Sequence, residues 1–172
     1  MEIYHITKDS PEWLLKAYDY VRTDSFCFGQ NIPIEMEFSH DTPRQELQAV
    51  VLIEDHKPIA GCRITFPTEE AGKIERVCVI REKQRNGYGE ILIKDAEKWI
   101  LESGVKHIVI NSQDRAAGFY NKLGYVTNFD VNPSLYEKHS PKKEEDEKSS
   151  DEKKKEHKID LGFTCVLVEK YF

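Results

Sequence analysis

A strand, a short basic loop with two glycines and a helix follow one another near the middle of the chain, and this unit most constrains the fold. The apolar run Val77–Ile80 is typical of a buried strand, and the amphipathic run Glu90–Leu101 predicts a helix packed on that strand. Between them, Gly87 and Gly89 allow a tight turn in which backbone N–H groups converge on an anion at the helix start. The pattern predicts a phosphate-binding loop between a strand and a helix.

The length and composition of the chain exclude several classes of protein. With 172 residues, the chain is expected to form a single domain, 1–172, and its formal charge of -6 argues against a nucleic-acid binder. The four cysteines are far apart and lack zinc-site spacing, so we predict reduced thiols and no metal. No apolar segment approaches the length of a membrane span. We therefore expect no membrane partner and a cytoplasmic location, with the nucleus left open.

The flanking segments predict a sheet built mainly from antiparallel strands. Met1–Thr7 is a candidate edge strand, Ser10–Arg22 an amphipathic helix, and Ser25–Arg44 a long functional loop or short broken helix. Three antiparallel strands follow, at 49–53, 59–66 and 73–80. A helix then separates the last of them from the strand 105–110, so these two should be parallel neighbours.

The last part of the sequence predicts a short helix, a highly charged segment and a final strand. A short helix is predicted at Asp114–Lys122, and the β-rich run Leu161–Phe172 is predicted to return to the sheet. Between them, Pro141–Lys158 consists almost entirely of Lys, Glu, Asp and Ser, which cannot bury a core. We therefore expect a charged, disordered insertion at about 137–158, forming a long excursion between two strands.

Two motifs resemble those of the GNAT N-acetyltransferases. Gln84–Gly89 matches the Gln/Arg-x-x-Gly-x-Gly/Ala signature of that superfamily, and Ala117–Tyr125 resembles its Phe-Tyr-x-x-x-Gly-Phe motif. Gln113 and the stretch Phe26–Asp41 make the chain most similar to the ElaA/YjcF-like branch. The charged insertion departs from that branch, which has a short hairpin there, so the resemblance does not carry over an acceptor.

The resemblance implies an α/β (α+β) fold with a mostly antiparallel central sheet, flanking helices and two parallel strands that splay apart. Acetyl-CoA would enter between the strands at Val77 and Val105 as a cosubstrate. The backbone would hold its pantetheine arm like an added strand, and the loop N–H groups would hold its pyrophosphate. The cofactor-binding residues implied are Val77, Cys78, Val79, Gln84, Arg85, Asn86, Gly87, Tyr88, Gly89, Glu90, Asn111 and Gln113.

The implied reaction is transfer of an acetyl group to a primary amine, on a small molecule or a protein, by direct attack on the thioester. Tyr120 matches the family's general-acid tyrosine. For the general base we choose Glu75, expected on the same side-chain face as Val77 and Val79. A backbone N–H near Val79 would polarise the thioester oxygen. The reserve carboxylates are Glu35, Glu37 and Asp41.

Alternatives stay open at several positions. A dinucleotide-binding loop is disfavoured because position 92 is Leu where a third glycine is needed. Tyr120 could be a core tyrosine, Glu75 a solvent-facing partner of Arg76 or Lys73, and Cys78 a packing residue. A non-catalytic acyl-CoA-binding or protein-interaction module is the alternative to an enzyme. The acceptor amine and a homodimer are also left open.

Overall fold

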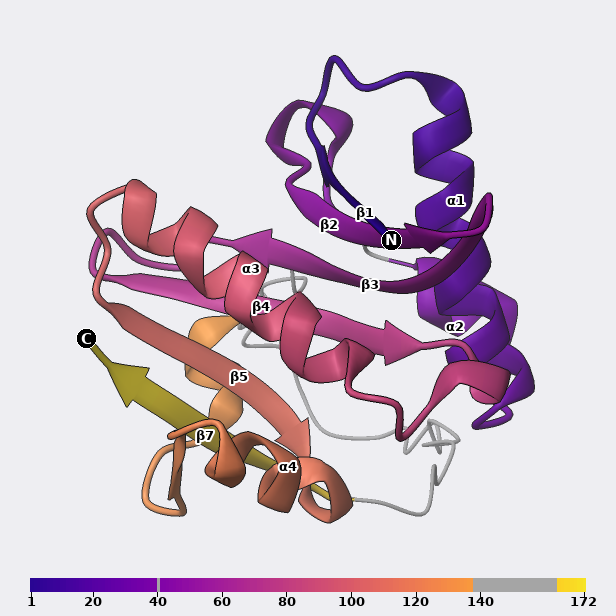
Figure 1. Cartoon of the computed structure of the whole chain (residues 1–172). Coiled ribbons are helices and arrows are strands. Elements are labelled where there is room, and N and C mark those ends of the chain that lie inside the picture. Colours follow the sequence, from indigo (N-terminus) through magenta and orange to yellow (C-terminus); the bar gives the residue numbers. More distant parts are fainter. Residues whose placement is uncertain (40, 138–163) are drawn as a thin grey trace, which may run out of the picture.

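The computed structural model describes residues 1–39, 41–137 and 164–172. Within them, seven strands form one sheet in the order β1-β2-β3-β4-β5-β7-β6 (Figure 1). Every neighbouring pair is antiparallel except β4 and β5. The strand bounds are β1 Glu2–Ile6, β2 Ala49–Glu54, β3 Lys57–Thr65, β4 Ala71–Val79, β5 His107–Gln113, β6 Val126–Asn128 and β7 Cys165–Tyr171. The mixed, mostly antiparallel sheet that we predicted is confirmed.

The helices also lie where the sequence predicts them. For the segment between Ser25 and Arg44, a long loop and a short broken helix were the two predictions. The structure has the broken helix, because a π-helical turn is followed by the short α2. The bounds are α1 Glu12–Arg22, α2 Ile34–Phe38, α3 Tyr88–Glu102 and α4 Ala117–Lys122, with the π turn at Thr23–Phe28 and 3-10 turns at Arg44–Glu46, Arg81–Lys83, Asp114–Ala116 and Pro133–Tyr136.

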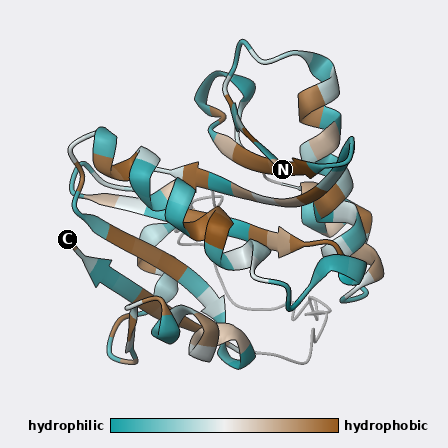
Figure 2. Cartoon of the chain, in the orientation of Figure 1, coloured by the Kyte–Doolittle hydropathy of each residue, from teal (hydrophilic) through white to brown (hydrophobic). Residues whose placement is uncertain are grey.

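Helices α1 and α3 cover the centre of the sheet from opposite faces. A Cβ on Gly61 of β3 would lie 2.9 Å from Val21 of α1, and a Cβ on Gly72 of β4 would lie 2.5 Å from Ile100 of α3. Glycine at these two positions lets each helix approach the strands closely. Figure 2 shows hydrophobic residues along the central strands and hydrophilic ones on the outer side of α3, and the core lies between these layers.

Strands β4 and β5 pair for only part of their length. Their parallel register covers Ala71–Lys73 against His107–Val109, and beyond that β4 continues to Val79 and β5 to Gln113 without pairing to each other. The two strands therefore splay apart at their C-terminal ends, which confirms the predicted opening. Strand β7 pairs with the whole outer edge of β5, so the sheet continues on that side (Figure 1).

A β-bulge interrupts β4 at the start of this opening. Glu75 is opposite Arg63 and Cys78 is opposite Gly61, so two β4 residues, Arg76 and Val77, face the single residue between those partners on β3. Arg76 adopts a left-handed conformation with φ of 54°. The extra residue reverses the alternation of side chains along the strand.

The predicted insertion at about 137–158 lies outside the described residues, apart from its first position. The strands on either side of it, β6 and β7, pair antiparallel, so the expected return of the chain to the sheet is confirmed.

Candidate active site

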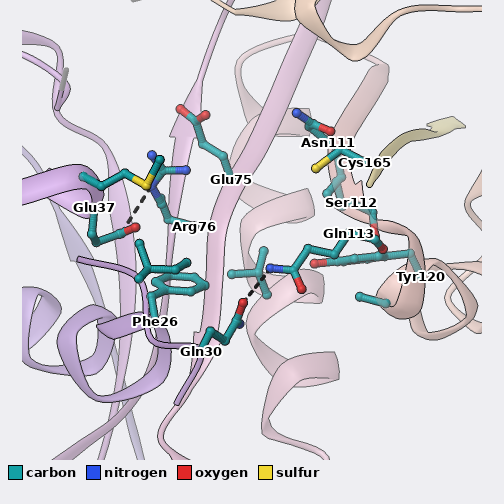
Figure 3. Close-up of a pocket in the computed structure, with 15 residues that line it drawn as sticks. Phe26, Gln30, Glu37, Glu75, Arg76, Asn111, Ser112, Gln113, Tyr120 and Cys165 are labelled. Carbon is teal, nitrogen blue, oxygen red and sulfur yellow. Dashed lines mark hydrogen bonds and ion pairs between the residues drawn. The ribbon is translucent and has the colours of Figure 1, made fainter. Parts of the chain in front are cut away.

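A cavity of about 330 Å³ lies in the opening between β4 and β5. Strand β4 lines one side and β5 the other, while the segment from the π turn to α2 and helix α4 close it (Figure 3). Its polar lining consists of Gln30, Glu37, Glu75, Arg76, Asn111, Ser112, Gln113 and Tyr120, joined by Cys165. A cavity of this size, apolar in part and lined by a few converging polar groups, is typical of small-ligand sites.

The β4 side of the opening presents a strand edge that pairs with no other described strand beyond Lys73. The N–H of Ile80 donates to the carbonyl oxygen of Ile59 on β3, and backbone groups alternate in direction along a strand. The backbone groups of Val77 and Val79 therefore face the opening, whereas those of Cys78 face β3. One acceptor on this edge is already used, because Gln84 Nε2 donates to the carbonyl oxygen of Val79 at 3.1 Å.

The glycine loop joins this edge to the start of α3. Arg85 and Gly87 have positive φ angles of 61° and 85°, and Gly87 is the N-cap of the helix. Asn86 holds the turn by donating Nδ2 hydrogen bonds to the carbonyl oxygens of Lys83 and Gln84. The first N–H groups of a helix have no intrahelical acceptor and favour an anion.

The side chains of this loop point in different directions. Tyr88 donates its hydroxyl to Glu54 at 2.8 Å, so its ring is tied to the β2–β3 hairpin. Glu90 pairs with Lys94 at 2.6 Å, as its spacing predicts. A Cβ on Gly89 would lie 3.1 Å from the ring of Phe119, so glycine there allows α4 to approach the start of α3.

The β5 side contributes amides. The Asn111 Oδ1 atom is buried and has no hydrogen-bond partner among the described residues. Because a buried unsatisfied acceptor is costly, it points to a missing donor such as a ligand amide. Gln113 Nε2 donates to Gln30 Oε1 at 2.7 Å, and Arg115 Nη2 reaches the same oxygen at 3.2 Å. Figure 3 shows the Gln30–Gln113 bond linking the two sides of the cavity.

Tyr120 reaches the cavity from α4 and is 6% exposed. Burial raises the pKa of its hydroxyl, and the thiols of Cys62 and Cys78 add to that shift. The group therefore stays protonated at neutral pH, as a proton donor must. Its ring packs edge-to-face against Tyr125 at 6.0 Å between centroids. Tyr120 thus combines the core position of one sequence-based alternative with access to the cavity.

Glu75 lines the cavity, but the expectation that it shares a face with Val79 is wrong. The bulge lies between the two residues. Glu75 pairs across the sheet with Arg63, and Val79 pairs with Ala60. Because Arg63 and Ala60 are three residues apart on β3, their side chains lie on different faces of the sheet, and so do those of Glu75 and Val79. Glu75 instead faces α1 and α2, where its Oε1 lies 3.0 Å from Arg63 Nε and its Oε2 lies 3.2 Å from Lys73 Nζ. Burial favours the protonated acid, but Arg63 and Lys73 outweigh it and hold the pKa of Glu75 below its ordinary 4.5.

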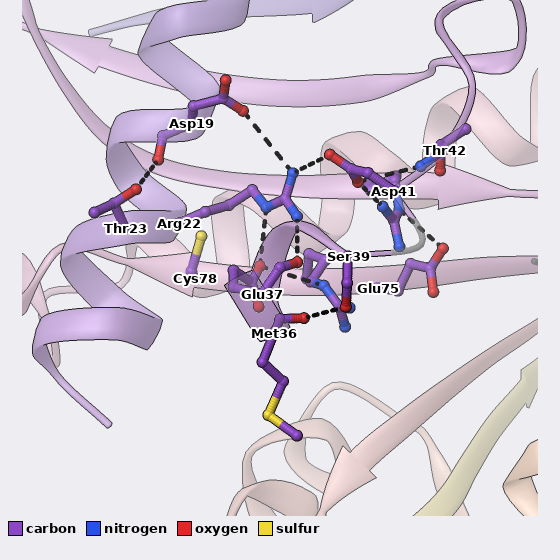
Figure 4. A network of polar contacts seen from close by, with 12 residues as sticks. Asp19, Arg22, Thr23, Met36, Glu37, Ser39, Asp41, Thr42, Glu75 and Cys78 are labelled. Atoms are coloured by element: carbon purple, nitrogen blue, oxygen red, sulfur yellow. Dashed lines mark hydrogen bonds and ion pairs between the residues drawn. The ribbon is translucent and has the colours of Figure 1, made fainter. Parts of the chain in front are cut away.

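A buried network of charges continues behind Glu75 (Figure 4). Arg22, which is 1% exposed, donates from Nε to Glu37 at 2.9 Å and from Nη1 to Asp41 at 3.0 Å. Asp41 also pairs with Arg63. Of the reserve carboxylates, Glu37 lines the cavity, whereas Asp41 lies behind it and Glu35 is exposed on α2.

Sequence reasoning missed the role of Arg22. A signal was present, because Arg22 follows Tyr18 by four residues and so falls on the apolar stripe of α1. A cation on a buried stripe implies a buried partner. The identity of that partner, 15 residues further on, follows only from the fold.

The described residues contain neither a membrane-spanning helix nor a cluster of metal-ligating side chains. None of their helices is long and apolar enough to cross a membrane. They contain no group of three or more His, Cys, Asp or Glu side chains arranged to hold a metal ion. All four cysteines are free, with Cys62 and Cys78 buried and Cys165 exposed.

The sequence and the structure both match known proteins. Residues 3–125 match the model of the acetyltransferase (GNAT) family. The uncharacterized N-acetyltransferase YjcF of Bacillus subtilis (strain 168) is 34% identical over 111 residues, which cover 64% of this chain and 77% of YjcF.

Among solved structures, Escherichia coli ElaA aligns with a TM-score of 0.70 at 16% identity and covers 99% of both chains. The catalytic domain of the Tetrahymena GCN5 histone acetyltransferase, in complex with coenzyme A, aligns with a TM-score of 0.63 at 14% identity, covering 99% of this chain and 92% of that one. At these identities, the two structures establish a common fold.

Proposed function

Because the chain belongs to the acetyltransferase (GNAT) family, we propose that it is an acetyl-CoA-dependent N-acetyltransferase that acts on a primary amine. The observation that carries this proposal is the unpaired edge of β4 beyond Lys73, which leads directly into the left-handed turn at Arg85 and Gly87. A strand edge followed by a helix N-terminus suits an amide-containing arm that ends in a phosphate.

The residues of the opening fit such a ligand. The backbone of Val77 and the N–H of Val79 face an edge where pantetheine amides could pair. Asn111 lines the same cavity, and its buried Oδ1 has no donor among the described residues. The N–H groups from Arg85 to Glu90 would hold the pyrophosphate, with Arg85 adding a cationic fork. A fold neighbour described in complex with coenzyme A supports this assignment.

Acetyl-CoA, when bound, supplies an acetyl thioester. The acceptor nitrogen attacks its carbonyl carbon, so that a C–N bond forms, the C–S bond breaks and the amine loses a proton. Tyr120 would donate its hydroxyl proton to the departing thiolate. The N–H of Val79 would stabilise the developing oxyanion.

Glu75 would accept the amine proton, directly or through water. Its lowered pKa keeps it ionised, but an ammonium group with a pKa of about 10.4 holds its proton far more tightly. Glu75 therefore acts best on an acceptor that reaches the cavity as the neutral amine or loses its proton during attack. Activity should rise with pH through the neutral range for this reason.

The alternative is a non-catalytic acyl-CoA-binding or protein-interaction module. The protonated Tyr120 in the cavity favours the enzyme. Isothermal titration with acetyl-CoA, followed by a thiol-release assay over a panel of amines, distinguishes the two functions. Binding with turnover supports the enzyme, and binding without turnover on any amine supports the module. Absence of binding at millimolar concentration would eliminate both.

A further inference from the structure

Arg76 lines the cavity, and among the described residues it shares its ionic partner with Arg22. Its Nε atom is buried without a hydrogen-bond partner among the described residues, while 36% of the side chain is exposed. Its one ion pair within the described part of the chain joins Nε to Glu37 Oε1 at 3.3 Å. That oxygen already accepts a hydrogen bond from Arg22 at 2.9 Å. Arg76 is therefore a partly exposed guanidinium on the cavity wall that shares the carboxylate it contacts with Arg22.

The backbone holds Arg76 in this place at a cost. A left-handed conformation in a residue other than glycine costs about 1–3 kcal/mol, and such strain clusters at ligand sites. The bulge also turns Arg76 toward Glu37, on the side of the sheet that Glu75 faces. Figure 3 shows Glu75 and Arg76 beside each other on the β4 side of the cavity.

The charged side chains around the cavity form a network of ion pairs. The network joins four cations to four carboxylates; the cations are Arg22, Arg63, Lys73 and Arg76, and the carboxylates are Asp19, Glu37, Asp41 and Glu75. Asp19 is its outermost member, 3.9 Å from Arg22 and 54% exposed. Both carboxylates that line the cavity are thus already neutralised, and Arg76 is the cation at its surface.

We propose that Arg76 binds a carboxylate on the acceptor, so that the substrate class is amino acids and related amines that carry an acidic group near the amine. This inference rests on the proposed acetyltransferase function. A guanidinium fork matches a carboxylate in a bidentate geometry. Arg76 immediately precedes Val77–Val79, so an acid held by Arg76 presents its amine beside the proposed thioester site and Glu75.

A polyamine or another purely cationic acceptor fits this cavity less well. Such an acceptor would place a second cation against Arg76, and the carboxylates available to it, Glu37 and Glu75, are each already held by two cations. Like charges in a partly buried site repel strongly.

The test is a thiol-release assay on the full chain with acetyl-CoA and matched acceptors. Each set contains an amino acid, its carboxamide and its decarboxylated amine. The proteins are the wild type, Arg76→Gln, Arg76→Lys and the control Arg44→Gln, which removes a 45% exposed arginine outside the cavity. The carboxamide rate of each variant serves as its internal control for folding.

The wild type should prefer the free acid over the carboxamide by a factor on the order of 10 to 100 in kcat/KM. Arg76→Gln should abolish that preference by raising KM for the acid, Arg76→Lys should retain part of it, and Arg44→Gln should keep all of it. Turnover without an acid preference, or an equal loss on acid and carboxamide in Arg76→Gln, overturns the inference but leaves the acetyltransferase standing. Failure of every acceptor in the wild type overturns both.

Discussion

The ion pair between Glu75 and Lys73 makes a quantitative prediction. Lys73 is 5% exposed, and its one ionic partner among the described residues is Glu75, at 3.2 Å. Glu75→Gln removes that charge and leaves a buried ammonium without compensation, whereas Arg63 keeps Asp41. Breaking a buried pair by removing one partner costs about 3–5 kcal/mol. Because 17% of the Glu75 side chain is exposed at the cavity, we expect about 3 kcal/mol, the lower end of that range.

A loss of this size is readily measured. For a chain of this length, about 3 kcal/mol corresponds to a fall in Tm of roughly 6–12 °C. Thermal and urea unfolding at pH 7 would give the value. Because the pKa of Glu75 is lowered in the folded protein, its stabilisation is present above pH 4.5 and is lost as pH falls through the lower folded value. The gap between wild type and Glu75→Gln should therefore narrow as pH falls below 4.5 and close once Glu75 is protonated in the folded protein.

A double variant separates the structural role of Glu75 from the catalytic one. Lys73→Met in the Glu75→Gln background removes the uncompensated charge and should restore much of the stability. If Glu75 is also the general base, turnover stays about 100-fold or more below wild type in this restored protein. A Glu75→Gln protein within about 1 kcal/mol of wild type would refute the ion-pair estimate. Wild-type turnover in the double variant would remove Glu75 from proton transfer.

Three further predictions concern other residues of the site and its supports. Tyr120→Phe should lower turnover about 100-fold while leaving acetyl-CoA affinity unchanged by titration, and full turnover would exclude it as the acid. Gly87→Ala should cost about 1–2 kcal/mol of unfolding free energy because its φ is 85°, and should weaken acetyl-CoA binding. Gly61→Ala should cost about 1–3 kcal/mol, because its new methyl group meets Val21 at 2.9 Å and Tyr18 at 3.1 Å; unchanged urea midpoints would contradict either estimate.

Local patterns were enough to predict most elements and their order. The period of two through β2–β4, the apolar stripe of α1 and the glycine loop before α3 each reflect neighbours in sequence. The parallel pairing of β4 with β5 followed from the intervening helix. These features depend on backbone propensity and hydrophobic period, which a single sequence contains.

Features that depend on contacts between residues far apart in the sequence could not be predicted from local patterns. The insertion of β7 between β5 and β6 requires pairing choices that no local period encodes. Strict alternation along β4 predicted the side chains of Glu75 and Val79 on the same face of the sheet. The bulge in the pairing of β4 with β3 shifts the alternation by one residue, so the two side chains lie on different faces. The bond from Gln113 to Gln30, 83 residues away, depends equally on the fold.

The bulge in β4 links the fold of this chain to its proposed chemistry. A strand without the extra residue would keep a strict alternation, so Glu75 and Arg76 could not both face the side of the sheet on which Glu37 lies. It would also continue with regular twist, whereas a bulge bends its strand, and here the bulge at Arg76 and Val77 lies shortly after Lys73, the last β4 residue that pairs with β5. One inserted residue thus brings Glu75 and the partly exposed guanidinium of Arg76 to the same side of the sheet, beside the open edge of β4. The left-handed conformation of Arg76 is consistent with this role, because a regular strand conformation would remove the charge arrangement that the acceptor is proposed to meet.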